Sequence, residues 1–169
     1  FNPSEFNSVT FKGELERTAR ARGLELVSVP SDSASGVADA ALALVAQKLD
    51  AVCQINDNLH EASFAGIATA ARRARVPLFA FSSPLVNQGA ALVLANDHAD
   101  GGREAGRIAA RVLRGESPGS IPYRGISKTV LAVNPAAAAE AGLKLPEALV
   151  ARASIVAGRT PAAAAAPAS

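Results

Sequence analysis

The chain has 169 residues, of which 49% are hydrophobic and 19% are charged, and its formal net charge is +2. These values suit a folded domain with a sizeable core and exclude a chain that is disordered throughout. A charge this small does not indicate binding to nucleic acid, although the sequence pI is about 9.0. Cys53 is the single cysteine, so no disulfide can form within the chain. No apolar run in the sequence reaches the length of a transmembrane helix.

Helical and strand-like patterns alternate along the sequence. Phe11, Leu15 and Ala19 recur every four residues and predict an amphipathic helix over 8–22, with Gly23 as its stop. The later predicted helices are 37–48, 61–73, 101–114, a short one from Asn134, and 146–153, and the predicted strands are 24–29, 50–55, 77–81, 90–95 and 129–133. This alternation is typical of βαβ units, so we predict an α/β fold with an open parallel sheet and helices on both faces. Residues 158–169 form an Ala/Pro tail that we predict to be disordered.

Polar loops follow the predicted strands or open the predicted helices. They lie at 2–8, 30–35, 56–60, 82–84 and 96–100. In an open parallel sheet, ligands bind at the carboxyl ends of the strands, where helix N-termini also favour a carboxylate or another anion. The convergence of hydroxyl and amide groups on one edge therefore predicts a binding site for a small polar molecule. For any single Ser, Asn or Asp in these loops, the alternative is that it only caps the helix that follows.

The run Asn56-Asp57-Asn58 has two interpretations. Two amides and a carboxylate directly after a buried strand can bind an ammonium group and the polar head of a ligand. Alternatively, the run forms an Asx-turn that caps the next helix.

No catalytic or metal-binding constellation is found in the sequence. Cys53 and His60 do not suggest a nucleophile and its base, because Cys53 is predicted in the middle of an apolar strand, where a small buried thiol is ordinary. His98 with Asp97 and Asp100 is too sparse a set for a metal site. Neither a dinucleotide-binding, a phosphate-loop nor a nucleophile-elbow motif is present. We therefore predict a protein that is not an enzyme and that uses no cofactor or metal.

Several motifs in order resemble one protein family. They are the opening Asn-Pro-x-Glu-x-Asn-Ser at 2–8, Asp57-Asn58 after a strand, Pro77 leading a strand into Ser82, Arg-Val-Leu-Arg-Gly-Glu-x-Pro-Gly-x-Ile-Pro at 111–122, and the segment 129–145 with its strand, Asn134 and short helix. Their order and spacing resemble the ABC-transporter substrate-binding proteins of the tryptophan/tyrosine-type group. Proteins of this group have the type I periplasmic-binding-protein fold. The resemblance covers about residues 1–156.

The resemblance implies a clamp of two α/β lobes that closes on a small molecule, an amino acid or a related compound, and delivers it to a membrane permease. Residues 1–88 would be the ligand-binding C-terminal lobe without its first strand. Residues 89–122 would be a strand and helix of the N-terminal lobe, and 123–157 would return to the C-terminal lobe. The surface that a complete N-terminal lobe would cover would be exposed, and the chain could associate through it. Such a protein would be periplasmic or lipid-anchored outside the cytoplasm.

The motifs also imply which residues contact the ligand. They are Asn7, Ser8, Asp57, Asn58, Ser82 and Asn96. Phe6 stands where the family often has Pro, and Ser83-Pro84 stands where it commonly has Ser followed by an acidic residue. An acidic group for a ligand amine is therefore not found at that position. The alternative function is an effector-binding domain of a transcription regulator, which has the same fold.

Overall fold

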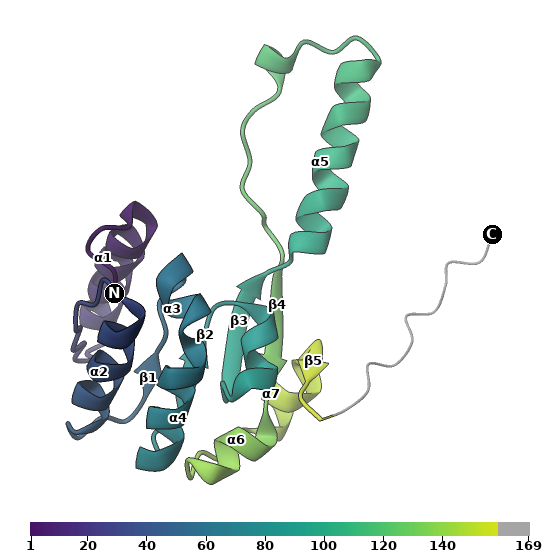
Figure 1. Ribbon diagram of the computed structural model, residues 1–169. Coiled ribbons are helices and arrows are strands. Elements are labelled where there is room, and N and C mark those ends of the chain that lie inside the picture. The colour runs from purple at the N-terminus through teal and green to yellow at the C-terminus, as the bar shows by residue number, and fades with distance from the viewer. Residues whose placement is uncertain (159–169) are drawn as a thin grey trace.

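A five-stranded sheet organises the computed structural model, which describes residues 1–158 (Figure 1). The strands lie in the order β1 (Val52–Cys53), β2 (Leu78–Ala80), β3 (Leu92–Asn96), β4 (Thr129–Val133) and β5 (Ile155–Val156). Strands β1, β2 and β3 are parallel, β4 is antiparallel to β3, and β5 is parallel to β4. The α/β class is confirmed, and the sheet is mostly parallel as predicted, with the pairing of β4 and β3 as the antiparallel exception.

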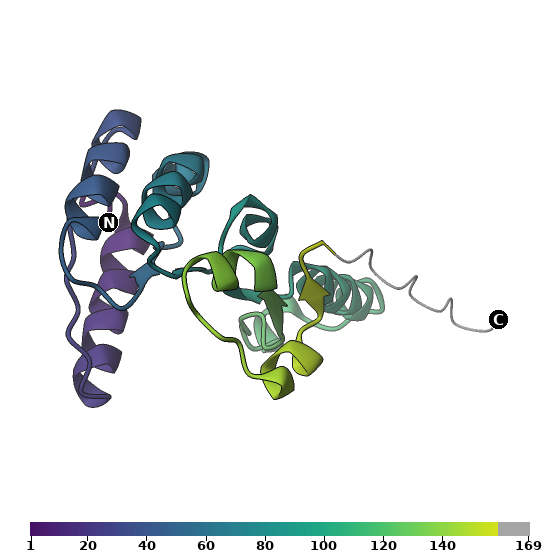
Figure 2. The ribbon, with the colours of Figure 1, turned by 90° about the horizontal axis from the view of Figure 1, so that it is seen from below.

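The helices connect and cover these strands. They are α1 (Phe6–Ala21), α2 (Ala34–Val45), α3 (Asn58–Ala62), α4 (Phe64–Ala74), α5 (His98–Leu113), α6 (Pro135–Glu140) and α7 (Glu147–Arg152), with short 3₁₀ helices η1 (Ser83–Gln88) and η2 (Pro118–Ser120). Helices α2 and α4 lie side by side in both views of the ribbon (Figures 1 and 2). Phe64 of α4, the largest fully buried side chain, and Val37 of α2 belong to the same core as strand residues such as Leu78. Burial of this apolar surface supplies most of the stabilisation.

Two predicted elements differ in the structure. Residues 24–29 form no strand, because a strand needs a backbone partner and only Phe1 supplies one beside them. The ammonium of Phe1 donates to the carbonyl of Val29 at 2.9 Å. The carbonyl of Phe1 accepts from the backbone amide of Ser31 at 2.9 Å. The helix predicted over 61–73 is divided into α3 and α4, since the backbone of Ser63 leaves the helical region at φ −99° and ψ 12°.

The strand predicted at 90–95 was assigned to the N-terminal lobe, but β3 pairs with both β2 and β4 in one sheet. The rest of the proposed division into segments stays a prediction.

Cys53 was expected to be buried, yet it is exposed. Val52 is buried and Cys53 is not, because successive side chains of a strand point to opposite faces of the sheet. The tail prediction falls, from residue 159 onward, outside the described residues.

Helix α5 projects away from the sheet, and the chain returns beside it (Figure 1). No residue of α5 is buried, and Leu113 is 88% exposed. The contacts of α5 are made with the segment that follows it. Arg111 forms a 2.5 Å ion pair with Glu116, and the side chain of Ile126 lies against Gly101. Within residues 1–158, none of the helices combines the length and apolar character needed to cross a membrane.

Asn134 is expected to be worth more to stability than an ordinary helix cap. Its carbonyl oxygen accepts from the amide of Ala137 at 3.0 Å, and its amide nitrogen donates to the carbonyl of Val86 at 2.9 Å. Asn134→Ala should therefore lower the free energy of unfolding by about 2 kcal/mol in urea denaturation. The control is Ser33→Ala, which removes an exposed cap bond to Gly36 and should cost about 1 kcal/mol. Equal losses for the two variants would show that the bond to Val86 contributes nothing.

Candidate functional site

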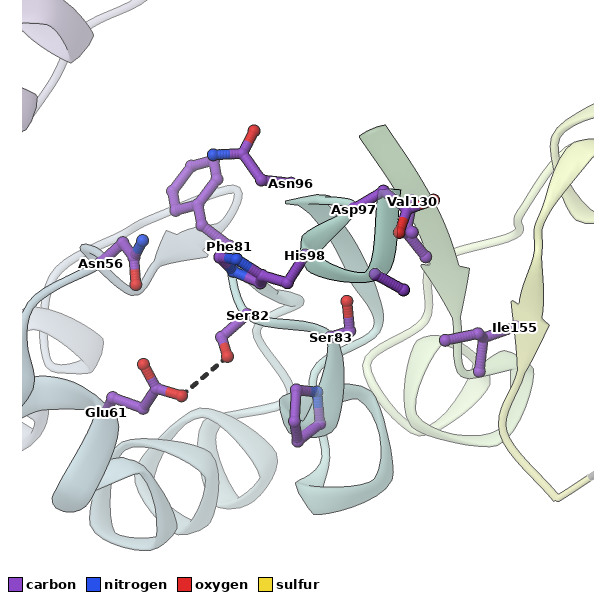
Figure 3. Close-up of a pocket in the computed structure, with 12 residues that line it drawn as sticks. Asn56, Glu61, Phe81, Ser82, Ser83, Asn96, Asp97, His98, Val130 and Ile155 are labelled. Carbon is purple, nitrogen blue, oxygen red and sulfur yellow. Dashed lines mark hydrogen bonds between the residues drawn. The ribbon is translucent and has the colours of Figure 1, made fainter. Parts of the chain in front are cut away.

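A hollow of about 500 Å³ opens at the carboxyl ends of β2 and β3 (Figure 3). Its lining consists of Asn56, Glu61, Phe81, Ser82, Ser83, Pro84, Asn96, Asp97, His98, Ala99, Val130 and Ile155. The loops after β2 and β3 supply most of these residues, because both strands run in the same direction and end at the same edge. This is the edge at which the sequence predicted a ligand site.

The hollow combines aromatic, hydroxyl, amide and carboxylate groups. The hydroxyl of Ser82 donates to Glu61 Oε1 at 2.7 Å, which joins the end of β2 to α3 (Figure 3). Phe81 and His98 supply ring surface, and Asn96 supplies an amide. Among the predicted contacts, Ser82 and Asn96 therefore lie in the hollow.

Glu61 and Phe81 were not predicted as site residues. Phe81 directly precedes Ser82 at the end of a predicted strand, so its position was a usable signal. Glu61 gave no such signal, because its place in the hollow depends on where α3 begins, three residues before the predicted helix start.

Ser8, Ser31, Asp57 and His60 form a buried cluster at the start of α3. Asp57 Oδ2 accepts from the hydroxyl of Ser8 at 2.5 Å, and Asp57 Oδ1 accepts from the backbone amide of His60 at 2.8 Å. The imidazole of His60 places Nδ1 2.7 Å from Asp57 Oδ1 and Nε2 2.9 Å from the hydroxyl of Ser31. Since an ionised carboxylate only accepts hydrogen bonds, Nδ1 carries a hydrogen. Ser8 is 0% exposed and Asp57 is 3% exposed.

The buried cluster keeps Asp57 ionised. Burial by itself would raise the pKa of this carboxyl group. The hydrogen bonds from the Ser8 hydroxyl and from the backbone and ring of His60 outweigh burial and hold its pKa below the ordinary value. Asp57 also caps α3 through the amide of His60, so the helix-cap interpretation of Asn56-Asp57-Asn58 holds for its central residue.

The order Ser31–His60–Asp57 has the connectivity of a hydrolase triad. Ser31 and His60 are each only 6% exposed. Neither the hollow of Figure 3 nor a second one of about 400 Å³ between α4 and α6 is lined by either residue. The side chains of the buried cluster instead bond to one another and join α1, the loop before α2 and the start of α3.

Side-chain contacts tie the opening loop and the first turn of α1 to the start of α3 and to the loop before it. The carboxylate of Glu5 accepts from the backbone amide of Asn58 at 3.2 Å and from its side-chain amide at 3.1 Å. Asn7 donates to the carbonyl of Asn56 at 3.2 Å. Asn7 is partly exposed and Asn58 is exposed. The predicted site residues therefore divide into those with accessible surface, Asn7, Asn58, Ser82 and Asn96, and the buried pair of Ser8 and Asp57.

Comparison with known proteins agrees with this architecture. A tyrosine-binding protein from Clostridioides difficile is 30% identical over 134 residues, which are 79% of this chain and 39% of the relative. The structure of a conserved domain protein from Vibrio cholerae has a TM-score of 0.81 at 29% identity and covers 92% of this chain and 52% of its own. A ligand-free, open substrate binding protein from Clostridium difficile has a TM-score of 0.72 at 26% identity, covering 86% and 49%.

A Streptococcus pneumonia structure, an ABC domain in complex with L-Trp, shares the fold. Its TM-score is 0.78 at 24% identity, with coverage of 92% of this chain and 54% of its own. The chain thus spans about two fifths to a little over half the length of these relatives. The sequence pattern of the family described as ABC transporter substrate binding protein matches residues 1–157. The chain belongs to the ABC transporter substrate-binding protein family, as the resemblance in its motifs predicted.

Proposed function

We propose that this chain supplies one half of the ligand site of an ABC importer's solute-binding protein and that the ligand is an aromatic amino acid. The observation that carries the proposal is the hollow at the carboxyl ends of β2 and β3, where Phe81 lies among amide, hydroxyl and carboxylate groups. Sites for small ligands combine apolar and aromatic walls with a few polar groups in this way. The relative named as a tyrosine-binding protein supports the same ligand class.

Each part of an aromatic amino acid has a matching group in the hollow. The ring of Phe81 can pack against the ligand ring. Pro84 stands where the family commonly has an acidic residue. Glu61 would supply this carboxylate from α3 and accept hydrogen bonds from the ligand ammonium. Asn96 and Ser82 would supply further polar contacts inside the hollow. Asn7 and Asn58 do not line the hollow and stay proposed contacts on the accessible surface beside it. Ser8 and Asp57 are buried and would support the site through Asn56, which lines the hollow and directly precedes Asp57.

In this proposal the chain binds its ligand without chemical conversion. Closure of a second lobe would complete the site and signal the loaded state to a membrane permease. The protein would act outside the cytoplasm, in the periplasm or on a lipid anchor.

Isothermal titration calorimetry of the 169-residue chain with L-tyrosine, L-tryptophan, L-leucine and glycine tests the ligand class. We expect saturable binding of the aromatic amino acids, with an affinity at least about tenfold higher than for leucine, because ring packing adds to apolar burial. Glycine should show no measurable binding. Equal affinity for all four compounds, or binding of none, would overturn the proposal.

Ser82→Ala is expected to weaken the binding of L-tyrosine about fivefold, the effect of losing a hydrogen bond worth about 1 kcal/mol. The hydroxyl of Ser82 orients Glu61, so without it the carboxylate rotates freely in the hollow. The matched control is Thr69→Ala, which removes an exposed hydroxyl that donates to Ala65 on α4. The same loss of affinity in both variants would mean that Ser82 has no special role.

A further inference from the structure

We propose that His60 is a positioning residue for the ligand hollow, which it shapes from within the buried cluster without touching the ligand. The inference rests on the proposed function, because it names the group that fixes the geometry of that same hollow. It starts from an observation independent of ligand identity: both ring nitrogens of a buried imidazole are bound to separate segments of the chain.

The buried cluster joins segments that are far apart in the sequence. Ser8 belongs to α1, Ser31 precedes α2, and Asp57 and His60 form the start of α3. The contact of His60 with Ser31 spans 29 positions, and that of Asp57 with Ser8 spans 49. Since both nitrogens of the His60 ring have partners, rotation of the ring would break one or both contacts. The imidazole therefore fixes the start of α3 relative to the loop before α2.

Rim residues lie directly beside the cluster in the sequence. Asn56 precedes Asp57, Glu61 follows His60, and both line the hollow. Glu61 in turn accepts the hydrogen bond from Ser82. Helix α3 has only 5 residues, and a helix this short does not hold its own conformation. Its orientation, and with it the position of the Glu61 carboxylate, depends on the cluster beneath it.

Substitutions of His60 separate its two contacts. His60→Leu removes both, whereas His60→Asn keeps an amide nitrogen near the place of Nδ1 and so retains the donor to Asp57. We expect His60→Leu to weaken binding of L-tyrosine about tenfold and His60→Asn to weaken it only about threefold, because the buried carboxylate of Asp57 loses its ring donor in His60→Leu, which disturbs its surroundings more than the loss of the contact with the Ser31 hydroxyl alone. Affinities are compared at a temperature at which circular dichroism shows every variant to be folded. Should His60→Leu not fold, Ser31→Ala replaces it, with about a threefold loss expected.

The matched control is Asn134→Ala, which lowers stability at the opposite edge of the sheet. It should leave the affinity for L-tyrosine within about twofold of the parent, since Asn134 does not line the hollow and substitutions at separate sites usually act independently. An equal loss of affinity in Asn134→Ala and His60→Leu would overturn the positioning role, because it would reduce the effect to general destabilisation. Unchanged affinity in folded His60→Leu would overturn it as well.

A second readout does not need a ligand. In amide NMR spectra of the ligand-free chain, His60→Leu should shift the signals of Asn56, Glu61 and Ser82, and His60→Asn should return them toward the parent positions. Unchanged signals in His60→Leu would contradict the proposal. If the signals move as expected while the parent binds none of the aromatic amino acids, the proposed function fails and the positioning role of His60 stands.

Discussion

Asp57→Ala is expected to lower the free energy of unfolding by about 3 kcal/mol, among the largest effects of any polar substitution in this chain. The carboxylate is buried and accepts hydrogen bonds from the hydroxyl of Ser8 and from the backbone and ring of His60. Its removal leaves these donors without an acceptor in a site that water does not reach. It also removes the cap of α3, so the rim of the hollow should be disturbed together with the fold.

Urea denaturation followed by circular dichroism measures this loss. The control is Asp39→Ala, an exposed carboxylate on α2, which should change stability by no more than about 0.5 kcal/mol. A loss for Asp57→Ala as small as that of the control would show that the buried cluster contributes little to the fold.

The same carboxylate should give the chain a distinct dependence on pH. Hydrogen bonds hold the folded pKa of Asp57 below its ordinary value, so the folded state releases the proton more readily than the unfolded state. The stabilisation is therefore complete above the unfolded pKa of about 3.9 and is lost as the pH falls through the folded pKa. Stability measured from pH 6 downward should fall less steeply below about pH 4 in Asp57→Asn than in the parent. Parallel curves for the two proteins would contradict this assignment.

The positions of the long helices were predicted most accurately from the sequence. The spacing of apolar residues and the caps placed α1 and α5 within a few residues of their observed bounds, 6–21 and 98–113. These signals are local, because a helix satisfies its own hydrogen bonds. The edge of the sheet that carries the hollow was also predicted, since parallel strands end together.

Pairing between distant segments could not be predicted from local patterns. Nothing in 24–29 shows whether a neighbouring strand is available, and nothing in β4 shows that it runs antiparallel to β3. The roles of Ser8 and Asp57 were equally hidden. A polar residue at the end of a strand is read the same way whether it faces a ligand or a buried histidine, and only the fold places His60 between Asp57 and Ser31.

Phe81→Ala is expected to weaken the binding of L-tyrosine and L-tryptophan about thirtyfold, equivalent to about 2 kcal/mol. Phe81 lines the hollow at the end of β2 and is the largest apolar side chain among the residues that form it. Its loss should affect leucine much less, because an aliphatic side chain gains burial from Phe81 but no ring-to-ring packing.

Calorimetry with the three amino acids distinguishes this effect from a general loss of structure. Phe11→Ala serves as the matched control, since it deletes the same side chain from an exposed position on α1 that does not line the hollow. A selective loss for aromatic ligands in Phe81→Ala alone would identify the ring as the source of specificity. Equal losses for leucine and tyrosine would instead mean that Phe81 only maintains the shape of the hollow, and the choice of an aromatic ligand would then have to come from residues outside it.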